Sequence, residues 1–203
     1  MLQIVTRATR ARYADVLADM HRDRKRVFVD RLGWQIPVLE GEFEIDQFDG
    51  EDAVYLLAMD ERGGHAGSLR LLPTLRPHLL SDVFPHLCER GVPRGSDIWE
   101  ITRLCTAPDL LDPRTVRREL MLGVIEFALL HGIRRYTCMT HVPYLSAVLA
   151  AGWDCHPLGL PQEDGGVSVG ALAIEMTPDT LRLMRDRTGI SANVLKIEAR
   201  DAA

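Results

Sequence analysis

A carboxylate and a guanidinium lie three residues apart at Glu100 and Arg103, in the segment IWEITRL. A carboxylate can take a proton as a general base, and the planar fork of an Arg can hold another carboxylate. Alternation along a strand puts the two side chains on opposite faces, unless a β-bulge re-aims one of them. The alternative is an ordinary Glu and Arg at a strand edge, each solvated or paired locally.

Arg70 lies between apolar neighbours in the segment SLRLLP. A charge buried there costs several kcal/mol unless it is paired, so it needs an acidic partner. Asp46 and Asp49, in EIDQFDGEDA, are the candidate partners. The alternative is an Arg that reaches the surface from an edge strand.

Cations and aromatic rings share the segment RDRKRVFVDRLGW, which contains Arg24, Phe28 and Trp34. Such groups can bind an anionic or sulfonium ligand through ion pairs and cation–π contacts. The alternative is an amphipathic helix whose Val27, Phe28 and Leu32 pack on a sheet.

The charge balance limits the class of partner. The chain has 203 residues and a formal net charge of -5, and Lys supplies two of its 24 cations, so Arg dominates. A basic N-terminal segment leads into an acidic one between positions 30 and 60. A net negative charge argues against general nucleic-acid binding, which usually needs a basic surface.

Several kinds of site and location are not predicted. No apolar run approaches 18 residues, and no signal peptide is visible, so we expect no membrane partner and a cytoplasmic protein. The four Cys are widely spread, which predicts reduced thiols and no metal site. The P-loop, G-x-G-x-x-G and G-x-S-x-G motifs are absent.

The order of the expected elements predicts a mixed sheet with helices packed on its faces, in one domain over 1–203. Residues 33–53 are expected to form a long loop. Strands are expected over 2–6, 53–59, 66–73, 97–107, 133–140, 153–157 and 166–176, and helices over 10–32, 79–90, 113–132, 142–151 and 178–188.

Nine residues in order resemble the signature of the acyl-homoserine-lactone synthases, the LuxI-type autoinducer synthases. The matching strings are R-x-x-x-F-V-x-x-L-G-W, IDQFD, GSLRLLPT, LSDVFP and WEITRL. The resemblance covers roughly residues 1–176 and is strongest over 22–107. The nine residues are Arg24, Phe28, Trp34, Asp46, Asp49, Arg70, Phe84, Glu100 and Arg103.

The resemblance implies an α/β sandwich with a GNAT-like acyltransferase fold. That fold has a central mixed, twisted sheet, helices on both faces, and a V-shaped splay between two parallel strands, here 97–107 and 133–140. It also implies a reaction in which S-adenosylmethionine, as a substrate and not a cofactor, is N-acylated by an acyl thioester. Lactonisation then releases methylthioadenosine, and the product is a quorum-sensing autoinducer.

Roles for particular residues follow from the resemblance. Glu100 is the expected base, directly or through water, and Arg103 is expected to grip the substrate carboxylate or to hold Glu100 ionised. The expected S-adenosylmethionine pocket contains Arg24, Phe28, Trp34, Arg103 and Val142. Asp46, Asp49 and Arg70 are expected to form a structural ion-pair network, and Phe84, Trp99 and Thr140 to pack or to line the acyl chain.

Two questions stay open on the sequence. The acyl donor is either acyl carrier protein or acyl-CoA; EIDQFDGEDAVYLL and HPLGLPQ resemble the subgroup that accepts branched or aryl acyl-CoA. The rival functions are a GNAT N-acetyltransferase using acetyl-CoA and a non-catalytic acyltransferase-like binding module. The acetyltransferase is disfavoured because APDLLDPRTVRREL lacks the glycines of a pyrophosphate-binding loop.

Overall fold

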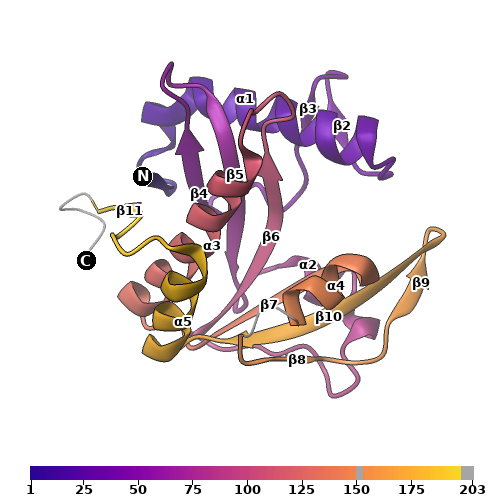
Figure 1. Cartoon of the computed structure of the whole chain (residues 1–203). Helices are drawn as coiled ribbons and strands as arrows, with labels where there is room; N and C mark the ends of the chain where they lie inside the picture. Colours follow the sequence, from indigo (N-terminus) through magenta and orange to yellow (C-terminus); the bar gives the residue numbers. More distant parts are fainter. Residues whose placement is uncertain (150–152, 198–203) are drawn as a thin grey trace. The chain divides into compact units, whose positions relative to one another are not determined.

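A computed structural model describes residues 1–149 and 153–197, as two compact units that are each built from non-contiguous segments. The first unit contains 1–71, 103–124 and the described part of 192–203, and the second contains 72–102 and the described part of 125–191. The boundaries between the units fall within β5 (His65–Pro73), β6 (Ile98–Thr106) and α3 (Pro113–His131), and between residues 191 and 192. Figure 1 labels these elements. The single domain expected over 1–203 stays a prediction.

The first unit contains a mixed sheet in the order β11-β1-β4-β5. Strand β1 pairs in parallel with β11 and antiparallel with β4, which forms an antiparallel hairpin with β5. The bounds are β1 Leu2–Val5, β4 Val54–Met59, β5 His65–Pro73 and β11 Leu195–Lys196. The hairpin confirms the expected pairing of 53–59 with 66–73, whereas the two-residue β11 is too short to give a sequence pattern.

Neighbouring residues of β4 point to opposite faces of this sheet. Both faces therefore carry apolar or aromatic side chains, and a helix covers each face. Leu56 faces α3 (Pro113–His131), where a Cβ added to Gly123 would lie 2.4 Å from the side chain of Leu2. Glycine at this position therefore allows the helix to approach the sheet closely. Tyr55 faces the opposite way, where its ring meets the ring of His21 on α1 (Ala14–Arg24) edge-on.

The helix expected over 10–32 consists of three consecutive helical forms. A 3-10 turn (η1, Arg10–Tyr13) leads into α1, and α1 continues as a π-helix (η2, Lys25–Arg31). The backbone N–H of Leu32 accordingly donates to the carbonyl of Val27, five residues earlier. π-Helical turns occur frequently at functional sites, and this one carries Phe28.

The segment 33–53 contains more structure than the loop expected there. Strands β2 (Val38–Leu39) and β3 (Phe43–Glu44) form a small separate hairpin. Its turn places Glu40 and Gly41 at φ 54° and 71°, and two consecutive positive φ values are what a type I′ turn requires. The sequence did not reveal the hairpin because its strands are only two residues long.

The second unit contains β6, β7, β10 and β8 in this order, and β9 also pairs with β10. Strand β6 pairs in parallel with β7 from Ile98 to Glu100, and both strands continue beyond this ladder. Strand β10 is antiparallel to β7 and β8. The bounds are β6 Ile98–Thr106, β7 Arg135–His141, β8 Cys155–Pro157, β9 Gln162–Asp164 and β10 Val167–Glu175. Parallel and antiparallel pairs together confirm the mixed sheet.

Helical segments also lie on both faces of β10. Val169 and Ala171 pack with Leu80 and Leu87, from α2 (Leu79–Asp82) and the 3-10 turn η3 (Pro85–Leu87). A Cβ added to Gly170 on the other face would meet Leu145 at 3.0 Å, from α4 (Val142–Leu149). The last two residues of the helix expected over 142–151 lie outside the described residues.

The helix expected over 79–90 is wrong in its extent. α2 ends at Asp82, and a separate turn begins at Pro85. A residue before proline is disfavoured in the α region, and Phe84 accordingly has φ -122° and ψ 37°. Helix α5 (Pro178–Thr188) confirms the expected bounds, with Thr177 capping its first turn and Gly189 ending it at φ 73°.

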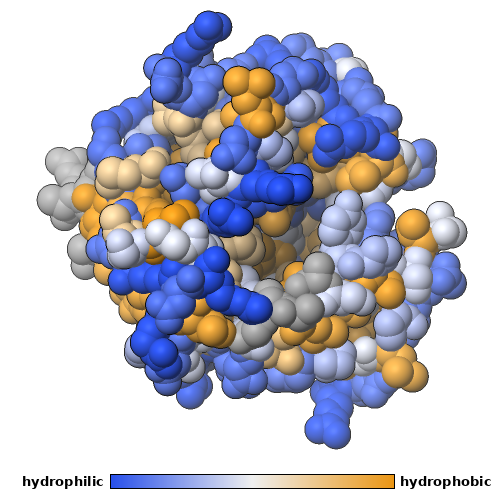
Figure 2. Space-filling model, in the orientation of Figure 1, coloured by the Kyte–Doolittle hydropathy of each residue, from blue (hydrophilic) through white to orange (hydrophobic). Residues whose placement is uncertain are grey.

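Hydrophobic and hydrophilic residues are interspersed on the face shown in Figure 2. Individual apolar side chains such as Leu111 and Leu160 are well exposed, which is normal for single residues at a protein surface. No helix among residues 1–149 and 153–197 has the length and apolar character needed to cross a membrane.

Candidate active site

Arg24 and Asp49 form a deeply buried ion pair of the first unit, with side chains 1% and 2% exposed. Nη1 and Nη2 of Arg24 donate to Oδ1 and Oδ2 of Asp49 at 2.8 and 2.9 Å. Arg70 makes the same kind of two-pronged contact with Asp46, at 2.6 and 3.0 Å, and also lies 2.8 Å from Asp49. These contacts bring together Arg70 and its two candidate partners in the ion-pair network expected from the sequence.

Glu44 joins this network to Arg103. Its Oε2 accepts from Nε of Arg24, and its Oε1 accepts from Nε and Nη2 of Arg103 at 3.1 Å. Glu44 is fully buried at the end of β3, and Asp46 binds Nη2 of Arg103 at 2.7 Å. Glu44 was not predicted from the sequence; its position two residues before Asp46, at the start of the EIDQFD string, was the available signal.

Arg103 adopts a left-handed backbone conformation, with φ 53°. A non-glycine residue there is strained by about 1–3 kcal/mol, and such strain clusters at functional sites. This conformation interrupts the regular alternation of β6 at Arg103. The guanidinium carbon of Arg103 lies 5.7 Å from the ring centroid of Phe28 and 6.0 Å from that of Trp34.

Phe28 and Trp34 stack nearly parallel, with ring centroids 4.7 Å apart and an angle of 12° between the planes. Val27, Phe28 and Cys105 form a buried cluster against which Trp34 and Ile36 pack. The aromatic pair therefore agrees with both interpretations of the sequence. It packs in a hydrophobic cluster, as an amphipathic helix would, and it offers a π-surface beside Arg103, as a binding segment would.

The charges of the network balance, because three guanidinium groups face three carboxylates. Burial alone would raise the pKa of Asp49, but Arg24 and Arg70 outweigh it and hold that pKa well below its usual range. Burial would lower the pKa of Arg24, which Asp49 and Glu44 instead hold above its ordinary value. The carboxylates of Glu44, Asp46 and Asp49 are close enough to share a metal ion, but their pairing with Arg already compensates their charge.

Tyr55 and Arg10 hold the loop that carries Asp49. The hydroxyl of Tyr55 donates to Oδ1 of Asp49 at 2.8 Å, and burial with the nearby carboxylate raises the pKa of Tyr55. Arg10 donates to the backbone carbonyls of Asp49, Gly50 and Ala53, and its guanidinium lies over the Tyr55 ring. Asp49 is thus fixed both through its side chain and through its backbone.

Glu100 lies in the second unit and is fully buried. Its Oε2 and Oε1 accept from the backbone N–H groups of Leu79 and Leu80, at 2.7 and 2.8 Å. Glu100 is therefore held by the first turn of α2.

The remaining predicted residues have local roles in the second unit. Phe84 packs against the cluster of Leu80, Leu87 and Val169, and Trp99 meets Phe127 edge-on at 5.8 Å. Thr140, in β7, pairs with Gly170 of β10 and is partly exposed, and Val142 is the first residue of α4. The structure thus brings Arg24, Phe28, Trp34, Asp46, Asp49, Arg70 and Arg103 together in the first unit.

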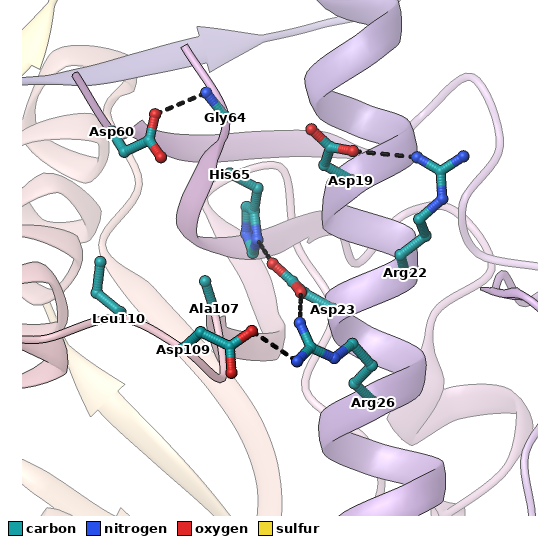
Figure 3. A pocket seen from close by; sticks show the side chains of 10 residues that line it. All are labelled: Asp19, Arg22, Asp23, Arg26, Asp60, Gly64, His65, Ala107, Asp109 and Leu110. Atoms are coloured by element: carbon teal, nitrogen blue, oxygen red, sulfur yellow. Dashed lines mark hydrogen bonds and ion pairs between the residues drawn. The ribbon is translucent and has the colours of Figure 1, made fainter. Parts of the chain in front are cut away.

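A pocket of about 410 Å³ opens elsewhere in the first unit (Figure 3). His65 and Asp23 line it, with His65 Nδ1 2.8 Å from Asp23 Oδ2, and Nε2 of His65 lies 3.0 Å from Ser68 Oγ. The order Asp–His–Ser resembles a hydrolytic triad, but Ser68 is only 1% exposed and does not line the pocket. The chain of hydrogen bonds therefore fastens α1 to β5.

A solved structure at low sequence identity shares the fold of this chain. A Lactobacillus plantarum protein assigned as an N-acetyltransferase aligns with a TM-score of 0.60 at 17% identity, over 87% of this chain and 99% of its own. The fold is therefore of the acetyltransferase-like kind expected from the sequence. The family model described as autoinducer synthase matches residues 8–183, and the chain belongs to this family of acyltransferase enzymes.

Individual relatives agree with this assignment. The acyl-homoserine-lactone synthase of Ralstonia solanacearum is 38% identical over 164 residues, 77% of this chain and 80% of the relative. The isovaleryl-homoserine lactone synthase of Bradyrhizobium diazoefficiens is 34% identical over 96% of this chain and 88% of its own. The structure of the CoA-dependent synthase BjaI, with SAM and isopentyl-CoA, has a TM-score of 0.89 at 33% identity, covering 98% of this chain and 93% of that one.

Proposed function

We propose that this protein is an acyl-homoserine-lactone synthase that makes a quorum-sensing autoinducer from S-adenosylmethionine and an acyl-CoA. The observation that carries the proposal is the position of Arg103, held by Glu44 and Asp46 beside the stacked rings of Phe28 and Trp34. A guanidinium beside an aromatic surface offers complementary contacts to a carboxylate and to a sulfonium, and S-adenosylmethionine carries both groups.

The reaction makes two bonds in sequence. The amine nitrogen of S-adenosylmethionine attacks the thioester carbonyl, so an N–C bond forms, the C–S bond breaks and the thiol leaves. A carboxylate oxygen then attacks the carbon next to the sulfonium, which closes the lactone and expels methylthioadenosine. No oxidant or further reactant is needed.

Glu100 is the proposed base, acting through a water. An α-amino group has an ordinary pKa near 8, so at neutral pH it must lose a proton before it can attack. Both oxygens of Glu100 accept a backbone N–H, so we assign the proton transfer to a bridging water rather than to direct contact. Backbone N–H groups around 102–105 are the proposed donors to the oxyanion, because the left-handed turn at Arg103 re-aims this part of β6.

Arg103 is the proposed contact for the methionyl carboxylate. Its Nε and Nη2 bind Glu44 and Asp46, and we assign Nη1 to the substrate. Phe28 and Trp34 would contact the sulfonium and adenosyl groups, and the role expected for Val142 stays a prediction. The Nε, Nη1 and Nη2 atoms of Arg24 all donate to Glu44 or Asp49. We therefore propose that Arg24 stabilises this pocket rather than contacting the substrate.

The proposed donor is acyl-CoA with a short branched chain, and acyl carrier protein is the alternative. The relative from Bradyrhizobium is named for an isovaleryl product, and BjaI is described as CoA-dependent. Phe84, Trp99 and Thr140 are the proposed acyl-chain contacts. We further propose that the protein acts in the cytoplasm, without a metal or a cofactor. The proposal includes no nucleic-acid partner and no membrane partner.

The test is to incubate the purified protein with S-adenosylmethionine and a panel of acyl-CoA and acyl-carrier-protein donors. Methylthioadenosine release that depends on the donor, together with an acyl-homoserine lactone, supports the proposal. Acetylation of amines without methylthioadenosine release would instead identify an N-acetyltransferase, and binding of S-adenosylmethionine without turnover of any donor would identify a binding module.

A further inference from the structure

The carboxylate of Glu100 depends on a very short helix. Helix α2 has four residues, and its first two backbone N–H groups hold both oxygens of Glu100. A four-residue helix is not stable by itself, because nucleating the first turn costs more than its few hydrogen bonds return. Some other contact must therefore fix the direction of these two N–H groups.

His78, the N-cap of α2, provides that contact. It is fully buried, and its Nδ1 lies 2.9 Å from the backbone carbonyl of Arg76 and 3.1 Å from the hydroxyl of Ser81. A carbonyl only accepts hydrogen bonds, so Nδ1 carries the proton and donates it. The imidazole thereby ties the turn before α2 to the residue that begins the helix.

Ser81 fastens the same turn from the other side. Its hydroxyl lies 3.0 Å from the carbonyl of His78 and accepts the backbone N–H of His78 at 3.4 Å. The backbone N–H of Asp82 donates to the same His78 carbonyl at 3.1 Å. The backbone of His78 is thus fixed at its N–H and its carbonyl, immediately before the two N–H groups that bind Glu100.

His78 is also kept neutral. Burial is the main cause that lowers its pKa, and Arg94 acts in the same direction, whereas the Arg76 carbonyl and Asp82 oppose them. A neutral imidazole donates from one nitrogen only, and the shorter of the two Nδ1 contacts is the one with the Arg76 carbonyl.

We propose that His78 is a positioning residue for the reaction: its Nδ1–H bond to the Arg76 carbonyl aims the N–H groups of Leu79 and Leu80 at Glu100 and so sets the direction of the Glu100 carboxylate. The inference rests on the proposed role of Glu100 as the base. His78 acts through α2, so it needs no contact with substrate.

A matched pair of substitutions isolates this role. In His78→Asn the side-chain NH2 can take the place of Nδ1 and keep the bond to Arg76, whereas in His78→Gln the amide lies one carbon further out. Neither variant introduces a charge. We expect kcat for methylthioadenosine release to fall about tenfold to a hundredfold in His78→Gln, with KM for S-adenosylmethionine and acyl-CoA within about twofold, and to stay near wild type in His78→Asn.

A double mutant separates positioning from a general effect on the fold. If His78 acts through Glu100, His78→Gln causes no further loss of kcat in a Glu100→Gln background. Equal losses in the Asn and Gln variants, or a full additional loss in the double mutant, would overturn the inference. Thermal unfolding of each variant checks the fold. If His78→Gln does not fold, Ser81→Ala replaces it, and we expect a smaller loss of kcat at unchanged KM.

The same experiments distinguish this inference from the proposed function. Wild-type protein that releases no methylthioadenosine with any donor overturns the proposed function. Wild-type activity in folded Glu100→Gln overturns the role of Glu100, and with it the inference. An inactive Glu100→Gln together with a fully active His78→Gln overturns the inference alone.

Discussion

Arg24 and Asp49 form a two-pronged ion pair whose partners are both almost completely shielded from solvent. Asp49 also binds Arg70 and Tyr55, and Arg24 also binds Glu44, so this pair connects the two halves of the network. A buried charge without its partner is expensive, so each member stabilises the fold only while the others are present.

Replacing Arg24 by Lys should destabilise the protein by about 3 kcal/mol, because an ammonium cannot reproduce three directed N–H bonds to two carboxylates. The matched control is Arg22→Lys on the same helix. Arg22 pairs with Asp19 and Glu42 at an exposed position, where solvent screens the ion pairs, so this substitution should change the free energy of unfolding far less. Urea unfolding of both variants measures the difference, and equal effects would contradict a buried network that needs the Arg fork.

Stability should fall at acidic pH through Asp49. The pKa of Asp49 is lowered in the folded protein, since Arg24 and Arg70 outweigh the effect of burial. Its contribution is therefore fully present above the unfolded pKa, near 4, and is lost progressively as the pH falls below it. Urea unfolding from pH 7 to pH 3 should show a steeper loss for the wild type than for Asp49→Asn. Parallel curves would mean that other carboxylates dominate.

Trp34→Ala should weaken binding of S-adenosylmethionine by about tenfold and leave binding of acyl-CoA within about twofold. The substitution removes one of the two stacked rings beside Arg103, and a desolvated cation–π contact contributes about 1–2 kcal/mol. Calorimetric titration of each substrate measures this. Trp34→Phe is the control, because it keeps an aromatic face, and equal weakening of both substrates would contradict the pocket assignment.

Glu100→Gln should lower kcat by a factor of about 10² to 10⁴, the usual contribution of a general base. The amide oxygen of Gln can still accept one backbone N–H of α2, but its NH2 group must face the other N–H. The variant should therefore also lose about 1–3 kcal/mol of stability. Single-turnover kinetics measures the chemical step, and thermal unfolding confirms that the variant is folded. Near-wild-type kcat in the folded variant would remove Glu100 as the base.

The residue types of the network were predictable from the sequence, whereas its geometry was not. An Arg among apolar residues requires an acidic partner, which made Asp46 and Asp49 candidates for Arg70. Glu44 was missed because its partner Arg103 is 59 residues away, and no local spacing reports a contact at that separation. The 33–53 segment was expected to be a loop because tertiary contacts, rather than strand propensity, stabilise two-residue strands.

By itself, the sequence determined the order of the long strands and helices, the aromatic and charged residues that form one site, and the family. The elements and the site residues depend on periodicity and on residue chemistry, which are local, and the family followed from the resemblance of nine residues in order. Tertiary structure decided that Glu44 links Arg24 to Arg103, that Arg103 takes a left-handed conformation, and that α2 is a single turn held to Glu100. The physical reason is that buried charges and orphan N–H groups choose their partners by proximity in space, which only the folded chain establishes.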